Sequence, residues 1–549
     1  MIRLRLPLAF LLLFIAASVL AQTTGGIVGK VTDSSGAAVP GVTVEAKSAA
    51  LQGTRTTVSE GDGGYRFVLL PPGQYSVSFD LSGFAPESRR SVVVPLGKDT
   101  TLDIMMRPAA VTEELVVSAN APVLDTTSTT LGANLSTHAI ETLPTGRNYA
   151  SIVQVVPGVA SDANPSNGTQ STISVYGSSG AENAYYIDGV NTTNMEYGFQ
   201  GKELNFEFIS EVDVKTGGYE PEFGRSTGGI INVITKSGGN QFSGDVFGYR
   251  DSNSLQSSAK TVVSTGGTQE GFTRKDFGVD AGGYIMRDRL WFFGAYDGVR
   301  NGIDNSLPEG PHAGDVVTSN SRRNLGSGKL TYNLGASQSL IASFLQDPRV
   351  DTGAINDANH TLNGDPSTYL GRQDFGGRDY ALRYDGSFAS KWIATGQVAR
   401  HREANSVGPA TAAGDAVQFR DVSNDNFQTG GFGLIQDKTF DRKHYASSLM
   451  SIFAGHELKG GIEFEQGTAQ VTKRMSGGQQ VDVFANPVNP AQPIFRHFYW
   501  TTPTATVDNA PLSQLVSSPE HRVTTAYLQD RWSIRDRFVV SYGVRWDRQ

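Results

Sequence analysis

The sequence predicts a mainly β protein that is exported and inserted in a membrane by strands. Glycine is abundant at 63 of 549 residues, charged residues make up 18%, and cysteine is absent. This composition is typical of many short strands joined by turns, and it excludes disulfides and thiolate metal sites. Acidic residues outnumber basic ones by 54 to 46. Nucleic acid is therefore not expected as a partner, because phosphate binding needs surplus Lys and Arg.

The first 21 residues have the form of a secretory signal peptide. Arg3 and Arg5 form a basic start, Leu6 to Leu20 is almost wholly apolar, and small residues precede a cleavage position after Ala21. An N-terminal membrane anchor is the less favoured alternative, because the run is short for a spanning helix. No later run approaches the ~18 apolar residues of such a helix, so any membrane insertion must use strands.

Residues 25–107 are predicted to form a small β-sandwich of about seven strands. The strand candidates are Ile27–Thr32, Val42–Ser48, Thr54–Ser59, Tyr65–Leu70, Gln74–Leu81, Ser91–Val94 and Thr100–Met106. Turn formers separate them, among them the Pro71-Pro72-Gly73 sequence. The segment resembles the carboxypeptidase regulatory-like domain, a transthyretin-like sandwich without a peptidase centre. The residues that carry this resemblance are Gly36, Pro40, Gly41, Tyr65, Phe67, Leu70, Gly73 and Tyr75.

His138 and Glu141 have the His-x-x-Glu spacing that some zinc carboxypeptidases use. A zinc site also needs a third ligand and a nearby general base, and the flanking sequence supplies neither. We therefore predict no metal site and place His138 on the surface of a short helix.

Residues 120–237 are predicted to form a small α+β domain with two short helices, broken by Pro144 and Pro157, followed by strands. In order, the sequence contains Leu143-Pro144 with Gly146-Arg147-Asn148, Pro157-Gly158-Val159, Tyr186-Ile187-Asp188-Gly189-Val190, Ile209–Val214 and Gly228–Lys236. The order and spacing resemble the plug domain of TonB-dependent outer-membrane receptors; a soluble α+β domain is the alternative. Asp188 is predicted to stabilise a turn.

A linker over 108–119 contains an extended segment that is typical of strand addition. Its residues are Glu113, Glu114, Leu115, Val116, Val117, Ser118 and Ala119. The family resemblance implies that this segment is a TonB box, which binds the inner-membrane energy transducer. An extended β-branched segment suits that role, because its backbone groups can pair with the edge of a partner's sheet. An ordinary interdomain linker is the alternative.

Residues 240–549 are predicted to form the N-terminal part of an antiparallel transmembrane β-barrel. In Glu457–Gln466, Leu458, Ile462 and Phe464 share one face while charged residues occupy the other. In Arg537–Asp547, Phe538, Val540, Tyr542, Val544 and Trp546 share the apolar face. Runs of ~10 residues with aromatic brackets are typical of strands that face lipid.

The predicted connections alternate between tight and long, as in outer-membrane barrels. Tight turns lie near 287–289, 335–337, 389–391, 455–456 and 533–535; long loops lie near 251–275, 301–322, 349–376, 404–442 and 468–520. The count is about eleven strands, with Gly431–Phe440 assigned to a loop. Receptors of the resembled family have 22 strands, so about half a barrel is expected. We interpret the chain as a fragment or truncated gene product.

The resemblance implies a TonB-dependent receptor for energy-coupled uptake of a polar ligand such as a glycan or siderophore. The sandwich before the plug resembles the Oar-like branch. Expected partners are the TonB-like transducer, outer-membrane lipid and the ligand, and the expected location is the outer membrane of a Gram-negative-type bacterium. Phe498, Tyr499 and Trp500, with Phe495 nearby, are ligand-binding candidates because aromatic rings stack on sugars or chelates. A non-transporting adhesion protein is the alternative; no catalytic residue, cofactor or enzymatic activity is expected.

Overall fold

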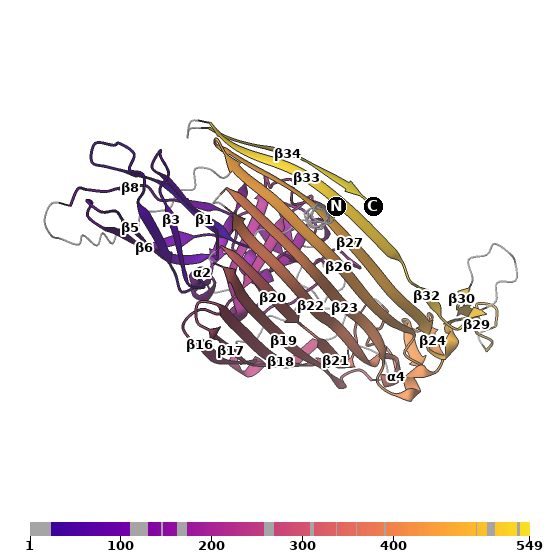
Figure 1. The fold of residues 1–549 in the computed structure, drawn as a ribbon. Helices are drawn as coiled ribbons and strands as arrows, with labels where there is room; N and C mark the ends of the chain where they lie inside the picture. The colour runs from indigo at the N-terminus through magenta and orange to yellow at the C-terminus, as the bar shows by residue number, and fades with distance from the viewer. Residues whose placement is uncertain are drawn as a thin grey trace.

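The chain folds into a sandwich, a plug and a large curved sheet (Figure 1). The structure is a computed structural model. It describes residues 23–109, 130–143, 146–161, 173–256, 268–307, 312–335, 337–357, 359–388, 391–489, 491–501, 511–534 and 538–549. The predicted signal peptide and the segment Glu113–Ala119 lie outside these residues. Within the described residues, no helix has both the length and the apolar character to span a membrane.

The N-terminal part is a β-sandwich, as predicted. One sheet contains β1 (Gly25–Thr32), β4 (Gly64–Leu70), β7 (Asp99–Thr101) and β8 (Ile104–Met105). The other has the order β3 (Thr54–Val58), β2 (Thr43–Lys47), β5 (Gly73–Asp80) and β6 (Glu87–Val94). The alternating apolar side chains of both sheets form one core that includes Ile27, Phe67 and Phe79. The last predicted strand is divided in two, because β7 and β8 each pair in parallel with a different part of β1.

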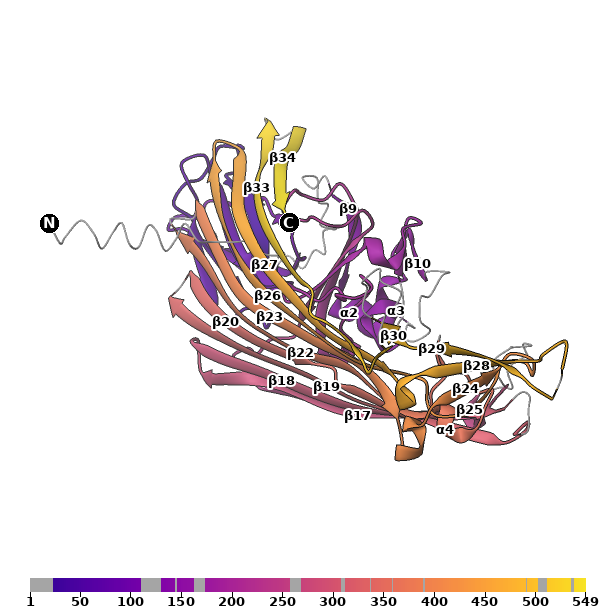
Figure 2. The same ribbon diagram turned by 90° about the vertical axis from the view of Figure 1, so that its right-hand side faces the viewer.

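The second part is an α+β domain around a five-stranded sheet. Its strands follow the order β13 (Val190–Asn191), β12 (Ala184–Ile187), β15 (Ile230–Thr235), β14 (Ile209–Gly217) and β9 (Leu131–Ser136). The two predicted helices are α2 (Thr137–Thr142) and α3 (Tyr149–Val153), and β10 (Val159–Ser161) pairs with β11 (Ile173–Val175). Tyr149, Phe208 and Val212 lie in its core. This domain lies on the concave side of the large sheet (Figure 2).

The third part is one antiparallel sheet whose main path runs through eleven described strands. They are, in sheet order, β16 (Ser243–Ser252), β17 (Thr268–Met286), β18 (Leu290–Ser306), β19 (Val316–Gly335), β20 (Gln338–Gln346), β22 (Leu370–Phe388), β23 (Trp392–Pro409), β26 (Leu434–Phe453), β27 (His456–Met475), β33 (Glu520–Ile534) and β34 (Phe538–Arg548). Two short strands pair beside this path: β21 (Arg349–Ala354) and β32 (Leu515–Ser517). The path agrees with the predicted count of about eleven.

The two faces of the large sheet differ in polarity as the alternation predicts. Ile462 and Phe464 are exposed on the convex side, while Glu463 and Glu465 are buried on the side of the plug. In β34, Phe538, Val540, Tyr542, Val544 and Trp546 are all exposed. The convex face therefore presents the apolar side chains expected to meet lipid.

Short connections lie at the sandwich end of the sheet and long ones at the far end (Figure 1). The prediction that Gly431–Phe440 belongs to a loop is wrong, because β26 begins at Leu434 and pairs with both neighbours. Backbone hydrogen bonds need no apolar side chains, so β26 stays paired with its neighbours beyond the level at which apolar side chains cover the convex face. The far end also has α4 (Pro366–Tyr369) and a small sheet of β25 (Phe427–Gly430), β24 (Gln418–Asp421), β28 (Gln480–Phe484) and β29 (Ile494–Phe498).

Candidate functional site: the plug–barrel interface

The interface between the α+β domain and the concave sheet is largely polar. Side chains of the inner face of the sheet are charged, and they meet charged and amide side chains of the smaller domain at several separate points. Apolar contacts are present as well: Val299, Leu325 and Leu345 of the sheet join the core of the smaller domain, and Val190 clusters with Ala381 and Ala399. The interface therefore combines small apolar clusters with many ion pairs and hydrogen bonds.

Lys202 makes the first contact point, on the loop that follows β13. Its Nζ atom lies 2.9 Å from Asp347 Oδ1 and 3.5 Å from Asp379 Oδ1. Burial alone would lower the pKa of Lys202, but the two carboxylates outweigh burial and raise it, so the ammonium group stays charged. Asp379 also accepts a hydrogen bond from His401 when Nδ1 of that ring carries a proton, at 2.8 Å. The site is a buried cation held by two acids of the sheet.

Asp188 makes the second contact point, in the tight turn between β12 and β13. Its φ of +48° lies in the left-handed region, which Asp tolerates better than most residues. Its carboxylate accepts hydrogen bonds from the backbone N–H and hydroxyl of Thr235 and forms an ion pair of 2.9 Å with Lys329 of β19. Asp188 therefore stabilises its turn, as predicted, and also attaches that turn to the sheet.

Arg225 makes the third contact point, in the loop before β15. Its guanidinium group donates to both oxygens of Glu465, at 2.9 and 3.0 Å, and lies 3.4 Å from Glu463. Close by, Lys459 of β27 forms an ion pair of 2.6 Å with Glu222. The planar pair of Arg225 and Glu465 fixes the orientation of the two groups as well as their distance.

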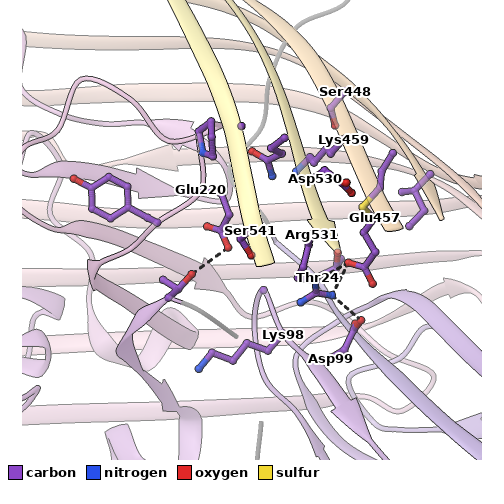
Figure 3. Close-up of a pocket in the computed structure, with 18 of the residues that line it drawn as sticks. Thr24, Lys98, Asp99, Glu220, Ser448, Glu457, Lys459, Asp530, Arg531 and Ser541 are labelled. Atoms are coloured by element: carbon purple, nitrogen blue, oxygen red, sulfur yellow. Dashed lines mark hydrogen bonds and ion pairs between the residues drawn. The ribbon is translucent and has the colours of Figure 1, made fainter. Parts of the chain in front are cut away.

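The sandwich contacts the rim of the sheet through four alternating charges. Arg66 lies 2.9 Å from both Asp99 and Glu457, and Arg531 of β33 donates to Glu457 at 2.9 Å. Figure 3 shows Arg531 between Glu457 and Asp99. These residues line a cavity of about 580 Å³ where the sandwich, the smaller domain and the sheet meet.

A buried carboxyl group joins the sandwich to the smaller domain. Glu211 of β14 is 3% exposed and accepts a hydrogen bond of 2.9 Å from the backbone N–H of Leu96. Burial raises the pKa of Glu211 to about 8, although the hydrogen bond from Leu96 opposes the shift. Glu211 therefore carries its proton at neutral pH.

A second cavity, of about 150 Å³, lies on the other side of the smaller domain, toward the long loops. The loop of Asn194 to Glu203 lines the plug side of this cavity, and side chains of β22, β23 and β26 line the barrel side. Its lining combines both signs of charge with aromatic rings: Arg323, Arg349, Lys202, Lys438, Glu203, Asp347, Glu403, Tyr197, Phe199 and Phe375. Such a lining suits a polar ligand with groups of both charges.

The structure places the ligand-binding candidates away from this cavity. Phe498 ends β29, Tyr499 follows it, and Trp500 begins β30 (Trp500–Thr501), all among the external loops. Phe498 and Tyr499 are 37% and 44% exposed. The guanidinium group of Arg496 lies 4.9 Å from the ring centre of Phe484 and 4.8 Å from that of Phe498. These aromatic residues form an external surface, and their role in ligand binding stays a prediction.

His138 lies on α2 and is exposed, as the sequence predicts. Among the described residues, no group of three or more His, Cys, Asp or Glu side chains is arranged to hold a metal ion. The segment Glu113–Ala119 lies outside the described residues, so its role also stays a prediction.

Sequence reasoning missed the contact points of the smaller domain. The inward direction of Glu463 and Glu465 could be predicted from alternation, but their partner Arg225 lies about 240 residues away. Lys202, which follows a Gly-Phe-Gln-Gly stretch, carries no signal beyond its charge. Tertiary structure alone brings these pairs together.

The sandwich, the enclosed domain and the sheet with its apolar convex face define an outer-membrane β-barrel protein with a plug. Residues 26–107 match the carboxypeptidase regulatory-like domain, residues 125–230 the TonB-dependent receptor plug domain and residues 234–309 the outer membrane beta barrel domain. The three parts of the chain are thus each similar to one of these domain families, in the same order along the chain.

Two relatives are similar to the chain in sequence. The chain is 28% identical to the TonB-dependent transporter Oar of Myxococcus xanthus, over 95% of this chain and 57% of Oar. It is 27% identical to the protein YddB of Escherichia coli over 30% of this chain and 24% of YddB. The crystal structure of the outer membrane transporter YddB superposes with a TM-score of 0.55 at 16% identity, covering 76% of this chain and 56% of YddB. The chain thus spans little more than half the length of Oar.

Proposed function

We propose that this protein takes up a polar ligand across the outer membrane in an energy-coupled manner, with the plug as the movable part. The observation that carries the proposal is the polar plug–barrel interface. When a polar interface separates, its charged and polar groups can bind water in place of each other. When a large apolar interface separates, the free energy gained by burying apolar surface is lost. A plug held in this way can be loosened locally, at its polar contact points, without exposing a large hydrophobic surface.

The proposal assigns distinct roles to the two cavities. The cavity beside Lys202 lies toward the external loops and would receive the ligand, since its lining offers donors, acceptors and aromatic rings. The cavity beside Arg531 lies at the sandwich end, where a ligand would leave. Between them lies the plug sheet, which must rearrange for passage. Phe498, Tyr499 and Trp500 would make the first contact with the ligand outside.

The segment Glu113–Ala119 is proposed to bind the energy transducer. The name of the plug family and the relative Oar support this role, and the position of the segment before β9 suits it, because force on the segment would reach the plug sheet through this strand. No catalytic step is required for such a transporter.

An engineered disulfide tests whether the plug must move. Asn205 of the plug donates a hydrogen bond of 2.5 Å to Asp297 of β18, and both side chains are short. The chain has no cysteine, so a disulfide in the double variant Asn205→Cys/Asp297→Cys can join only these two positions, and its formation is checked by mass spectrometry before uptake is measured. Uptake is measured in whole cells with three labelled probes: a ferric chelate, an oligosaccharide and a short peptide.

The oxidised variant is expected to lose uptake of whichever probe the unmodified protein imports, and reduction is expected to restore it. A matched control places a disulfide within the plug at Ala133 and Val214, which are cross-strand partners in β9 and β14. This control crosslinks the plug without tethering it to the barrel and should keep uptake. Full uptake by the oxidised Asn205–Asp297 variant would refute the proposed movement.

Deletion of residues 113–119 tests energy coupling separately. Uptake should fall to the level of cells without the transducer, while surface expression and probe binding at the cell surface remain. Unchanged uptake with normal surface expression would refute the assignment of this segment. If cells attach to surfaces through this protein but no probe enters in any strain, the adhesion alternative would replace the transport proposal.

A further inference from the structure

The loop of residues 194–203 belongs to the plug and lines the cavity that lies toward the long loops. We call it the plug loop. Its first end is held by Glu403 of β23, whose Oε1 atom accepts hydrogen bonds from the side chain of Asn194 at 2.9 Å and from the backbone N–H of Met195 at 3.0 Å. Glu403 is 6% exposed, so this contact is shielded from solvent.

The last end of the plug loop is held by Asp347. The carboxylate of Asp347 accepts hydrogen bonds from Nζ of Lys202 and from the backbone N–H of Glu203, both at 2.9 Å. Nζ of Lys202 also lies 3.5 Å from Oδ1 of Asp379 in β22. Both ends of the loop are therefore attached to carboxylates of the barrel wall.

A single histidine ring lies between the carboxylates of the two ends. His401 of β23 is 1% exposed, its Nδ1 atom lies 2.8 Å from Asp379 Oδ1, and its Nε2 atom lies 3.5 Å from Glu403 Oε2. Within the described part of the chain, Nε2 has no hydrogen-bond partner. At 3.5 Å, the attraction between the ring and Glu403 depends on the charge of the ring more than on a hydrogen bond.

The protonation state of His401 changes the balance of charge around the plug loop. A protonated ring donates from both nitrogens and attracts both acids, whereas a neutral ring can donate to one acid and turns a lone pair toward the other. The charged groups that face the ring are Asp379, Glu403, Lys202, which shares Asp379 Oδ1 with the ring, and Arg442, its cross-strand partner in β26.

The basic groups of β26 near this ring are paired with other acids. Nε of Arg442 lies 3.7 Å from Glu465 Oε1, and Nε2 of His444 lies 2.9 Å from Glu463 Oε1. The acids at the two ends of the plug loop therefore depend on Lys202 and on the charge of the histidine ring for compensation.

We propose that His401 is a positioning residue whose charge attaches the plug loop to the barrel wall, so that the loop opens and the cavity widens when the ring becomes neutral. An imidazole in water loses its proton at about pH 6.5, whereas in the attached loop two buried acids hold the proton. Protons therefore favour the attached loop, and a rise of pH through the neutral range favours the open loop. The consequence for ligand capture rests on the proposed function, but the attachment itself does not.

Hydrogen exchange of the full chain in mild detergent tests the proposal from about pH 5.5 to 8.5, around the range in which histidine titrates. The measured quantity is the protection factor of the Met195 and Glu203 amides, which corrects for the pH dependence of chemical exchange. His401→Gln removes the titrating ring and keeps a polar side chain. His444→Gln is the matched control, because His444 is also buried on the inner face beside an acid, whose partner in the plug is Arg225, outside the plug loop.

In the unmodified protein, both protection factors should fall at least about tenfold from the acidic to the alkaline end. Losing one interaction with a charged group changes an equilibrium by roughly 10- to 100-fold. His401→Gln should show no slope and should exchange at every pH as the unmodified protein does at the alkaline end. His444→Gln should keep the slope. Glu211 also titrates in this range, but all three proteins contain it, so it cannot create a difference between them.

Protection that does not change with pH in the unmodified protein would overturn the proposal, as would an unchanged slope in His401→Gln or an equal loss of slope in His444→Gln. If His401→Gln does not reach the outer membrane, Glu403→Gln takes its place. That variant removes the acid that faces Nε2 and should reduce the slope at Met195; an unreduced slope would refute the proposal. The expected pH dependence in a protein that imports no probe would support the role of His401 and reject only the proposed uptake.

Discussion

Replacing Lys202 by Met should loosen the plug at its contact with the barrel wall. Met keeps much of the length of the side chain but removes the charge, so Asp347 and Asp379 lose the cation that lies 2.9 and 3.5 Å from them. Asp347 keeps hydrogen bonds from the backbone N–H groups of Glu203 and Gly377, and Asp379 keeps its contact with His401. Two buried carboxylates nevertheless remain close together without a compensating ammonium group.

The magnitude follows from the burial of the pair. Lys202 is 1% exposed and Asp347 6%. Removing one partner of a buried ion pair costs roughly 3–5 kcal/mol of stability. We expect about 3 kcal/mol here, because both acids keep other hydrogen bonds that partly stabilise their charges. Since about 1.4 kcal/mol changes an equilibrium tenfold, the locally open state of the plug loop should become about 100-fold more populated.

Hydrogen exchange of the backbone amides in residues 199–205 measures this opening, with amides of β17 and β18 as an internal reference. Lys391→Met is a matched control, because Lys391 is 57% exposed and 3.8 Å from Glu60, and such surface pairs contribute at most about 1 kcal/mol. The double variant Lys202→Met/Asp347→Asn should recover part of the protection, because it removes one of the unpaired charges. Exchange within about threefold of the unmodified protein would refute the assignment of Lys202 as an anchor.

Three further predictions concern the sandwich and the external loops. Because burial raises the pKa of Glu211 from 4.5 to about 8, the folded state binds its proton more tightly than the unfolded state; stability should therefore fall as pH rises from 4.5 to 8 and level off above. Glu211→Gln should flatten this profile. The measurement is the protection factor of the Leu96 amide in hydrogen exchange from pH 5 to 9, and an unchanged slope in the variant would contradict the prediction. Arg66→Ala should weaken docking of the sandwich by about 1 kcal/mol and make the Leu96 amide exchange faster, an effect that high salt should imitate in the unmodified protein. Trp500→Ala should lower capture of the imported probe at the cell surface without changing hydrogen exchange in the plug; unaltered capture would remove Trp500 from the ligand-binding surface.

Local patterns predicted the architecture closely because each part has its own periodicity. The sandwich strands from β1 to β6 follow alternation bounded by turn sequences such as Pro71-Pro72-Gly73. In the barrel, the alternation of Ile462 and Phe464 with Glu463 and Glu465 predicted which side chains face outward. Strand ends were less predictable. The assignment of Gly431–Phe440 to a loop is wrong because β26 continues beyond the apolar part of the convex face, where no hydrophobic pattern marks the strand.

Charges on the outer face of the large sheet show why surface clusters escape sequence reading. Arg250, Lys275, Arg300 and Arg322 are separated by 22 to 25 residues, and each looks like an isolated surface charge in the sequence. Hydrogen-bond register across four strands turns them into neighbours. A shift of one residue in any pairing would turn that strand's cation to the lumen.

The sequence by itself determined the β character, the three-part order and the polarity of each barrel face, since these depend on composition and on spacing within a few residues; it also predicts an export signal. The tertiary structure decided which charges meet: Lys202 with Asp347, Arg225 with Glu465, and the sandwich with the barrel rim. Such contacts join segments more than 140 residues apart. Their free energy depends on distance and burial, which are properties of the folded chain and leave no periodic pattern along the sequence.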